Sequence, residues 1–231
     1  MKTLTTIGFD ADDTLWHHER HYQLTETRFR QLLSAHASHD HLAERLIAAE
    51  KRNIGHYGYG VKGFTLSMIE TAIEVTGGKA PASVISEILE AGRELLAHPI
   101  ETLPGVEETL AALKGNYRLI VVTKGELLDQ ERKLAASGVD QYFDAVEIVS
   151  EKNAATYQRI FNRHGEGAER AMMVGNSLKS DIIPALEAGA FAVHIPSQHQ
   201  WALDHADEPG KHERFSRIGE IGMLQTLLSA L

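Results

Sequence analysis

The chain has 231 residues, of which 43% are hydrophobic, and it carries a formal net charge of -9 and no cysteine. This length allows one large domain or a core with a smaller inserted domain, and the apolar content excludes a disordered protein. The negative charge argues against partners such as nucleic acid or an anionic membrane surface, and the absence of cysteine excludes disulfides and thiolate catalysis.

No apolar run approaches the length of a membrane span, and the sequence reaches Asp10 before a signal-peptide core could form. We therefore expect a cytoplasmic protein that binds neither a membrane nor nucleic acid. The sequence leaves the oligomeric state open.

The first element is a short apolar run, "LTTIGFD", which predicts a buried strand ending at Asp10. A helical pattern follows from about residue 19 to residue 96. It predicts helices over residues 20–36, 40–52, 64–75 and 81–98. Asp40 is the expected N-cap of the second helix, and Pro81 is expected in the first turn of the fourth. The stretch "NIGHYGYGVKG" between the second and third helices is predicted to be a glycine-rich loop.

Beyond residue 105 the predicted strands and helices alternate. Helices are expected over residues 106–115, 126–138, 154–165, 180–189 and 223–231, and strands over residues 117–125, 145–152, 170–177 and 190–196. This alternation predicts an α/β fold with a mainly parallel sheet and helices on both faces. We expect residues 1–16 and 100–231 to form this core, with residues 17–99 inserted as a helical lid or cap domain.

Polar side chains stand where the predicted core strands end. Asp10 ends the first strand and Thr123 the second, while Lys152, Asn176 and Asp181 follow the next two. The carboxyl ends of parallel strands open onto one crevice, where such sheets bind their ligands. We therefore expect these side chains to form one site.

The residue types at this site favour phosphoryl transfer. Asp10, Asp12 and Asp13 repel one another unless a cation or a proton lies among them. Mg²⁺ prefers oxygen ligands and would relieve this crowding, while Thr123 and Lys152 would hold phosphoryl oxygens. Asp10 would attack phosphorus to give an aspartyl phosphate. Asp12, on the same side as Asp10 if the chain stays extended, would protonate the leaving oxygen and later activate water.

In this order the residues resemble the haloacid dehalogenase superfamily, most of whose members are phosphatases. The first motif of that family, Asp-x-Asp-x-Thr after a strand, stands here as "DADDT" at residues 10–14. The second motif, a Ser or Thr at a strand end, is matched by Thr123, and the third, a lysine before a helix, by Lys152. The fourth usually reads Gly-Asp-x-x-x-x-Asp and stands here as "GNSLKSD" at residues 175–181.

The resemblance implies a Rossmann-like core in which the helical insertion is the family's C1 cap. It also implies that Asp10 is the nucleophile and a metal ligand. Asp12 would be the general acid and base, and it would bind the metal through its backbone carbonyl. These two residues would carry the chemistry.

The remaining matched residues would bind phosphate and metal. The resemblance implies that Thr14 steadies the loop, and that Thr123 and Lys152 bind the phosphoryl group. Asn176 and Asp181 would complete a Mg²⁺ site with Asp10 and Asp12. Asn176 stands where the family usually has aspartate, so the site loses one negative charge.

The predicted function is a magnesium-dependent phosphatase of a small phosphorylated metabolite, since a helical lid would exclude macromolecules. A haloacid dehalogenase or a phosphomutase on the same scaffold, and a non-enzymatic phosphate-sensing module, remain as alternatives. Asp12 favours phosphate over halide, because dehalogenases of this family typically lack an acid at that position. Tyr57, Tyr59 and Lys62 in the glycine-rich loop are candidate residues for substrate selection.

Overall fold

The computed structural model describes residues 4–230. Its chain divides into two compact units, a core unit formed by Met1–His17 with Ile100–Leu231 and a helical unit formed by His18–Pro99. The first three residues of the predicted core range and Leu231, the expected end of the last helix, lie outside the described residues.

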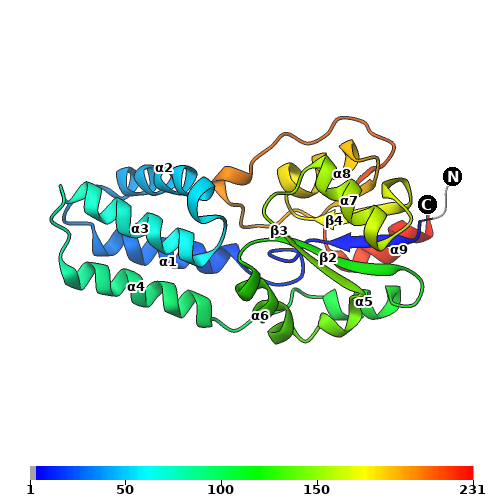
Figure 1. The fold of residues 1–231 in the computed structure, drawn as a ribbon, viewed down its shortest axis with the longest axis horizontal. Coiled ribbons are helices and arrows are strands. Elements are labelled where there is room, and N and C mark those ends of the chain that lie inside the picture. Colours follow the sequence, from blue (N-terminus) through cyan, green and yellow to red (C-terminus); the bar gives the residue numbers. More distant parts are fainter. Residues whose placement is uncertain (1–3, 231) are drawn as a thin grey trace. The chain divides into compact units, whose positions relative to one another are not determined.

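A six-stranded sheet of order β3-β2-β1-β4-β5-β6 forms the centre of the core unit, and all its strand pairs are parallel (Figure 1). The strands are β1 Thr6–Phe9, β2 Arg118–Lys124, β3 Ala145–Val149, β4 Ala171–Gly175, β5 Phe191–His194 and β6 Phe215–Arg217. The predicted α/β fold with a parallel sheet is confirmed. The sequence pattern did not predict β6, because three residues are too few to show a period of two.

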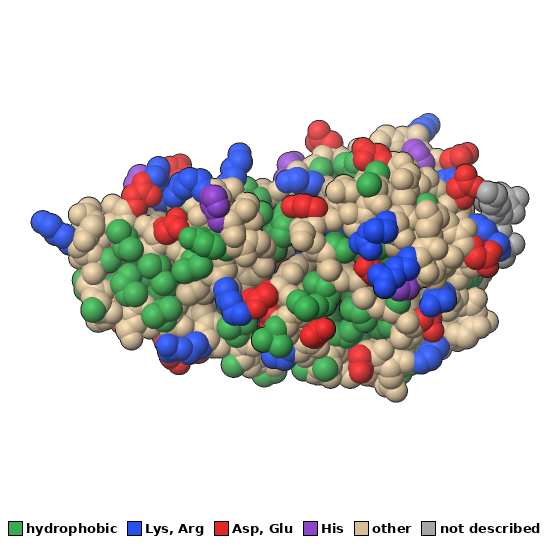
Figure 2. Space-filling view, viewed as in Figure 1, with side chains coloured by type: hydrophobic (Ala, Val, Ile, Leu, Met, Phe, Trp, Pro, Cys, Tyr) green, Lys and Arg blue, Asp and Glu red, His purple; other side chains and the backbone are tan. Residues whose placement is uncertain are grey.

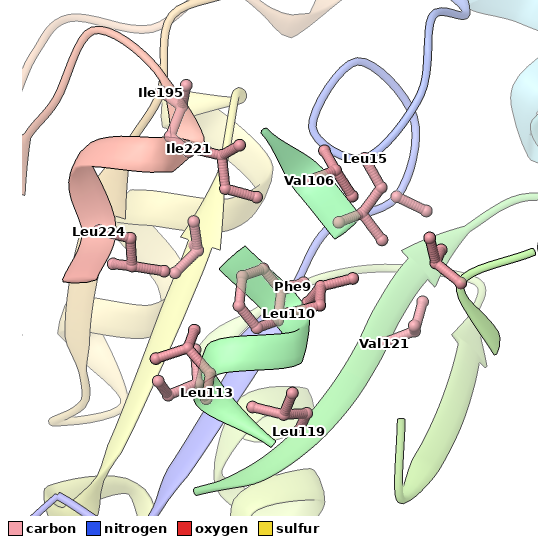
Figure 3. Packing of buried hydrophobic residues seen from close by; sticks show 14 of the residues in the cluster. Phe9, Leu15, Val106, Leu110, Leu113, Leu119, Val121, Ile195, Ile221 and Leu224 are labelled. Carbon is pink, nitrogen blue, oxygen red and sulfur yellow. The ribbon is translucent and has the colours of Figure 1, made fainter. Parts of the chain in front are cut away.

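Helices cover both faces of this sheet, as predicted. In β2, Leu119 and Val121 belong to one apolar cluster and Ile120 and Val122 to another, since successive strand residues point to opposite faces. The first cluster packs α5 Val106–Leu113, α6 Leu127–Ser137 and α9 Leu224–Ser229, and the second packs α7 Ala154–His164 and α8 Ile183–Glu187. Figure 3 shows Phe9 of β1 beside Leu110 of α5 in the first cluster.

The core chain comes together where it connects to the helical unit. The Trp16 backbone forms an antiparallel bridge with Thr102. On either side of it, His17 N–H donates to the Glu101 carbonyl at 3.0 Å and Leu103 N–H donates to the Leu15 carbonyl at 2.9 Å. These bonds hold both ends of the insertion next to each other at the surface of the core unit.

The helical unit has an apolar core of its own. Its helices are α1 Glu19–Leu32, α2 His39–Tyr57, α3 Val61–Val75 and α4 Ala82–Ala97. Phe29, Leu46, Met68 and Ile88, one from each helix, are buried in a single cluster. A unit of this size with its own cluster has what a small domain needs to fold.

Two expected helix starts in this unit differ from the structure by one or two residues. The N-cap of α2 is Ser38, whose hydroxyl accepts a hydrogen bond from the His41 N–H, and not Asp40. Serine has a short side chain that reaches the free N–H groups of a first turn as well as aspartate does. Pro81 is the N-cap of α4, and the helix begins at Ala82.

The predicted glycine-rich loop over residues 53–63 is mostly helix, and the prediction was wrong on this point. Helix α2 continues to Tyr57, and α3 begins at Val61, so the connection is only residues 58–60. Gly58 is the C-cap of α2 and Gly60 the N-cap of α3, with φ values of 73° and 120° that other residues rarely adopt. Asn53 remains helical and donates a hydrogen bond to Ser67 Oγ of α3 at 3.1 Å.

The surface carries both signs of charge. On the face shown in Figure 2, basic and acidic side chains alternate over both units, and apolar side chains gather on the helical unit. Leu66, Ile73 and Leu89 are among its exposed apolar residues. Within residues 4–230, no helix combines the length and apolar composition needed to span a bilayer.

Candidate active site

The predicted site residues lie along one edge of the sheet, at the carboxyl ends of four strands. Asp10 directly follows β1, Thr123 is the next-to-last residue of β2, Lys152 comes after β3, and Asn176 directly follows β4. Parallel pairing of β1 with β2 and with β4 aligns the three strand ends. Asp10, Thr123 and Lys152 are buried, so the site is built into the core unit and is not a set of surface charges.

Lys152 bridges two buried carboxylates. Its Nζ forms ion pairs with Asp10 Oδ1 and, at 2.7 Å, with Asp181 Oδ1. The side chains of Lys152 and Asp181 are 2% and 1% exposed, so solvent screens these interactions little. One ammonium facing two carboxylates leaves the group with a surplus of negative charge when all three are ionised.

Burial and the neighbouring charges shift the pKa values of Asp10 and Lys152. Burial, followed by repulsion from Asp181, raises the pKa of Asp10 to about 7 against the opposing effect of Lys152. Burial by itself lowers the pKa of Lys152, but attraction to the two carboxylates outweighs it and raises that pKa above its usual value. A further positive charge beside Asp10 would lower the pKa of its carboxyl and favour the ionised, nucleophilic form.

Asp181 is held tightly by its surroundings. Its Oδ2 accepts a hydrogen bond from the Ser177 N–H at 3.0 Å within a π-helical turn, Leu178–Ile182, that precedes α8. A Cβ placed on Gly175 would lie only 2.3 Å from Asp181 Oδ2. Glycine is therefore needed at this strand end so that the Asp181 side chain can reach Lys152.

Three oxygen-bearing groups meet the amide of Asn176. One terminal atom of this amide lies 3.1 Å from Asp10 Oδ2, 3.2 Å from the Asp12 carbonyl oxygen and 3.2 Å from Thr14 Oγ1. With nitrogen at that position, the amide donates to Asp10 and Asp12. With oxygen there, the oxygens of Asn176, Asp10 and Asp12 are three acceptors in contact, an arrangement that a cation would stabilise.

The spacing of these oxygens fits a hard cation. Neighbouring ligand oxygens of octahedral Mg²⁺ are about 3.0 Å apart when the metal–oxygen bonds are about 2.1 Å. Within residues 4–230, no three His, Asp or Glu side chains are placed to hold a metal. A metal here would therefore depend on the Asp12 carbonyl and the Asn176 amide together with Asp10, while Asp181 is linked to this group through Lys152.

The Asp12 carboxylate contacts Trp16 and helix α6, and the chain turns directly after Asp12. Leu15 N–H donates to the Ala11 carbonyl at 2.8 Å, and Asp13 adopts a left-handed φ of 59°. This turn directs Asp12 toward Trp16, whose Nε1–H donates to Asp12 Oδ1 at 2.7 Å. The placement of Asp12 on the same side as Asp10 stays a prediction.

Two residues of α6 complete the surroundings of Asp12, and sequence reasoning missed both. Lys133 Nζ lies 2.7 Å from Asp12 Oδ1 and 2.9 Å from Oδ2. Gln130 Nε2 donates to Thr123 Oγ1 at 2.6 Å and lies 3.2 Å from Asp12 Oδ2. They stand three positions apart and so share one face of the helix. The only signal in the sequence was that this face is polar.

Tyr57, Tyr59 and Lys62 belong to the helical unit. Tyr57 is the exposed last residue of α2, Tyr59 lies in the three-residue connection, and Lys62 is exposed in the first turn of α3. The turn brings them together in the chain, and their part in substrate selection stays a prediction.

The sequence model of the haloacid dehalogenase-like hydrolase family matches residues 4–189. The chain therefore belongs to the haloacid dehalogenase-like hydrolase family, which confirms the family resemblance of its motifs. The match includes all four motif positions, from "DADDT" to "GNSLKSD".

Two curated relatives are a phosphatase and a nucleotidase by name. The glyceraldehyde 3-phosphate phosphatase of Methanothermobacter thermautotrophicus is 34% identical over 136 residues, 56% of this chain and 59% of that protein. The pyrimidine 5'-nucleotidase YjjG of Escherichia coli is 30% identical over 117 residues, 48% of this chain and 52% of that protein. The chain thus spans between 52% and 59% of the length of these relatives.

A solved structure resembles the whole chain. The crystal structure of a haloacid dehalogenase-like family hydrolase from Xanthomonas campestris has a TM-score of 0.87 and 39% sequence identity to this protein. The match covers 99% of this chain and 91% of that one. The similarity extends over both the core unit and the helical unit.

Proposed function

We propose that this protein is a magnesium-dependent phosphatase that hydrolyses monoesters of small phosphorylated metabolites. The placement of the Asp10 carboxylate carries the proposal. Its Oδ1 is paired with Lys152, and its Oδ2 faces the Asn176 amide and the Thr14 hydroxyl at 3.1 Å and 3.2 Å. A nucleophile between a fixed cation and a group of oxygen ligands suits attack on an anionic phosphoryl group.

The proposed reaction has two steps. An Asp10 oxygen attacks phosphorus, the bond from phosphorus to the ester oxygen breaks, and Asp12 donates a proton to that departing oxygen. A water molecule then attacks phosphorus of the aspartyl phosphate and gives its proton to Asp12, and the bond to Asp10 breaks to release inorganic phosphate. Asp12 returns to its starting protonation state.

The other site residues bind and orient. Thr123 and Lys152 hold phosphoryl oxygens, and Thr14 donates a hydrogen bond that orients Asp10. Asp10, Asn176 and the Asp12 carbonyl would hold Mg²⁺, with Asp181 as a neighbour through Lys152, and the bound ion would neutralise charge on the phosphoryl group.

The substrate class follows from the relatives. The names of the two curated proteins specify a triose phosphate and pyrimidine 5'-nucleotides, both small phosphate monoesters. We propose the same class here, with the helical unit His18–Pro99 as a cap that excludes macromolecules. Tyr57, Tyr59 and Lys62 of that unit would select the group attached to phosphate.

The proposal is tested by phosphate release from p-nitrophenyl phosphate, followed by triose phosphates, sugar phosphates and nucleoside 5'-monophosphates. We expect wild-type activity with Mg²⁺, its loss in EDTA, and a decrease of at least about 10³-fold in Asp10→Asn. Arg163→Met is the matched control, because Arg163 is an exposed cation of α7 paired with Glu147 and outside the site.

Retention of activity by Asp10→Asn, checked by mass spectrometry for deamidation, would overturn the assignment of the nucleophile. Release of halide from a 2-haloacid without metal, with no phosphate release from any ester, would identify a dehalogenase instead.

A further inference from the structure

We propose that Lys133 and Gln130 are positioning residues that fix the acid–base group Asp12 and link it to the phosphate-binding Thr123. The inference rests on the proposed phosphatase function, in which Asp12 protonates the leaving oxygen. It adds two residues of α6 to the machinery of that reaction.

Lys133 contacts both oxygens of the Asp12 carboxylate, at 2.7 Å and 2.9 Å. The Lys133 side chain is 5% exposed, and that of Asp12 is 21% exposed. A two-point contact from a buried ammonium restricts rotation of the carboxylate about its side-chain bonds more than a single hydrogen bond would. Lys133 therefore sets where the Asp12 oxygens lie.

Gln130 joins Asp12 to the phosphate-binding hydroxyl. Its Nε2 donates to Thr123 Oγ1 at 2.6 Å and lies 3.2 Å from Asp12 Oδ2 and 3.0 Å from the Lys124 carbonyl. A Cβ on Gly125 would come within 3.0 Å of Gln130 Cγ and Cδ, so the absence of a side chain there makes room for this amide. One amide thus holds the acid–base group and a phosphate-binding group at a fixed separation.

A purely structural role does not explain the buried lysine. Helix α6 is anchored in the core through Leu134, and a buried ion pair is often no more stabilising than apolar residues of similar volume. Burial of lysine also costs side-chain entropy. Lys133 lies 4.0 Å from Asp129 of its own helix, whereas both oxygens of Asp12 are within hydrogen-bond distance of its ammonium group, so we assign its role to Asp12.

The leaving group distinguishes positioning of an acid from general structural support. p-Nitrophenolate departs readily without a proton, whereas phenolate and especially benzyl alkoxide depend on an acid. The value of kcat/KM reports steps up to departure of the leaving group and excludes the later hydrolysis of the aspartyl phosphate. A variant with a misplaced Asp12 should therefore lose most on benzyl phosphate and least on p-nitrophenyl phosphate.

The absence of cysteine permits a direct rescue experiment. Lys133→Cys would contain the only cysteine of the chain, so alkylation with 2-bromoethylamine would restore an ammonium at this position alone. We expect Lys133→Cys to lower kcat/KM at least about 30-fold on benzyl phosphate and less than about 3-fold on p-nitrophenyl phosphate. Alkylation should restore most of the lost kcat/KM on benzyl phosphate. The same reagent should leave the kcat/KM of the cysteine-free wild type unchanged.

Equal losses on both esters, or a benzyl phosphate loss that alkylation does not reverse, would overturn the proposal. Arg163→Met is the matched control, since it removes an exposed cation of α7 that is paired with Glu147 of β3, and its ratio of the two kcat/KM values should equal that of wild type. Failure of wild-type protein to release phosphate from any ester with Mg²⁺ would instead overturn the proposed function, so the two failures are distinguishable.

A second pair of variants tests the proposal if Lys133→Cys does not fold. The two proteins are Asp12→Asn and the double variant Asp12→Asn with Lys133→Met. The double variant removes both charges of the Asp12–Lys133 ion pair, so neither charge is left unpaired. Because Lys133 acts through Asp12, the rate of p-nitrophenolate release in a single turnover should be the same in Asp12→Asn and in the double variant. A further tenfold loss in the double variant would show that Lys133 acts in another way.

Discussion

Asp10 and Asp12 are two positions apart in the chain, and the core unit surrounds them differently. Around Asp10, two buried carboxylates share the one ammonium of Lys152. Around Asp12, the acids Asp12 and Asp129 face the two bases Lys133 and Arg132, and Trp16 and Gln130 add neutral N–H groups. The first group has surplus negative charge, and the second is balanced.

The comparison shows that one loop can place the same type of side chain in two different electrostatic environments. A carboxylate in a group with surplus negative charge gains from an arriving cation, which suits a nucleophile and metal ligand. A carboxylate in a balanced group is held in place, which suits a residue whose position matters when a proton moves.

The largest expected effect separates the two lysines. Lys152→Met leaves Asp10 and Asp181 buried without their cation and should lower the free energy of unfolding by about 3–5 kcal/mol. Lys133→Met should cost only about 1–2 kcal/mol, because Asp12 is partly exposed and retains Trp16 and Gln130. Urea unfolding in EDTA measures both. Equal losses would show that the two groups are not electrostatically different.

The next effect tests the support of Asp181. Gly175→Ala would place a methyl group 2.3–2.6 Å from the Asp181 side-chain atoms, so Asp181 must move away from Lys152. We expect a loss of about 2–3 kcal/mol in unfolding free energy. Gly222→Ala is the control, since a Cβ there meets no atom within 4 Å and should change stability by less than about 0.5 kcal/mol.

A smaller effect concerns the neutral donor to Asp12. Trp16→Phe keeps an aromatic ring in the core but removes the Nε1–H that donates to Asp12 Oδ1 at 2.7 Å. The unfolding free energy should fall by about 1 kcal/mol. The loss should be larger when combined with Lys133→Met than the sum of the two single losses, because both side chains hold the same oxygen. Strict additivity in urea unfolding would argue against a shared role.

The smallest expected effect concerns a reference carboxylate, Glu147, whose neighbours carry more positive charge than it can neutralise. Glu147 of β3 pairs with His164 at 2.6 Å, Arg163 at 3.1 Å and Arg159 at 3.3 Å. Burial acts to raise the pKa of Glu147, but the hydrogen bonds and charges of His164 and Arg159 outweigh it and hold the pKa below its usual 4.5. A carboxyl whose pKa is lower in the folded state stabilises the protein above pH 4.5. It loses that contribution as the pH falls from 4.5 through the folded-state pKa.

Glu147→Gln should therefore be less stable than wild type by up to about 1 kcal/mol at pH 7. The difference in stability between wild type and Glu147→Gln should shrink as the pH falls below 4.5 and through the lower folded-state pKa of Glu147. Thermal unfolding at a series of pH values measures it. A difference that grows on acidification would have the wrong sign and would contradict the lowered pKa.

Much of the core unit could be predicted from the sequence. Alternating strands and helices define a parallel sheet, and the end of each strand places its next polar residue at one edge, which is why Asp10, Thr123, Lys152 and Asn176 were found together. The short β6 could not be predicted, because it is held by pairing with β5 and not by a pattern of its own.

The surroundings of Asp12 could not be predicted for a different reason. The partners of its side chain depend on the turn that the chain makes after Asp12, where Asp13 has a positive φ, and periodicity carries no information about such a turn. Gln130 and Lys133 belong to residue types that are mostly exposed on helices, and only the tertiary fold shows that they are buried against Asp12.

The backbone bonds that join residues 15–17 to residues 101–103 have a consequence for how such proteins diversify. Since the insertion leaves and rejoins the core at one antiparallel bridge, Trp16 with Thr102, a short turn could close the core chain at the same place. A different module could therefore replace residues 18–99 without altering the sheet or the strand ends that hold Asp10 and Lys152. Evolution, or an engineer, could in this way exchange the helical unit and leave the core sheet and its strand-end side chains in place.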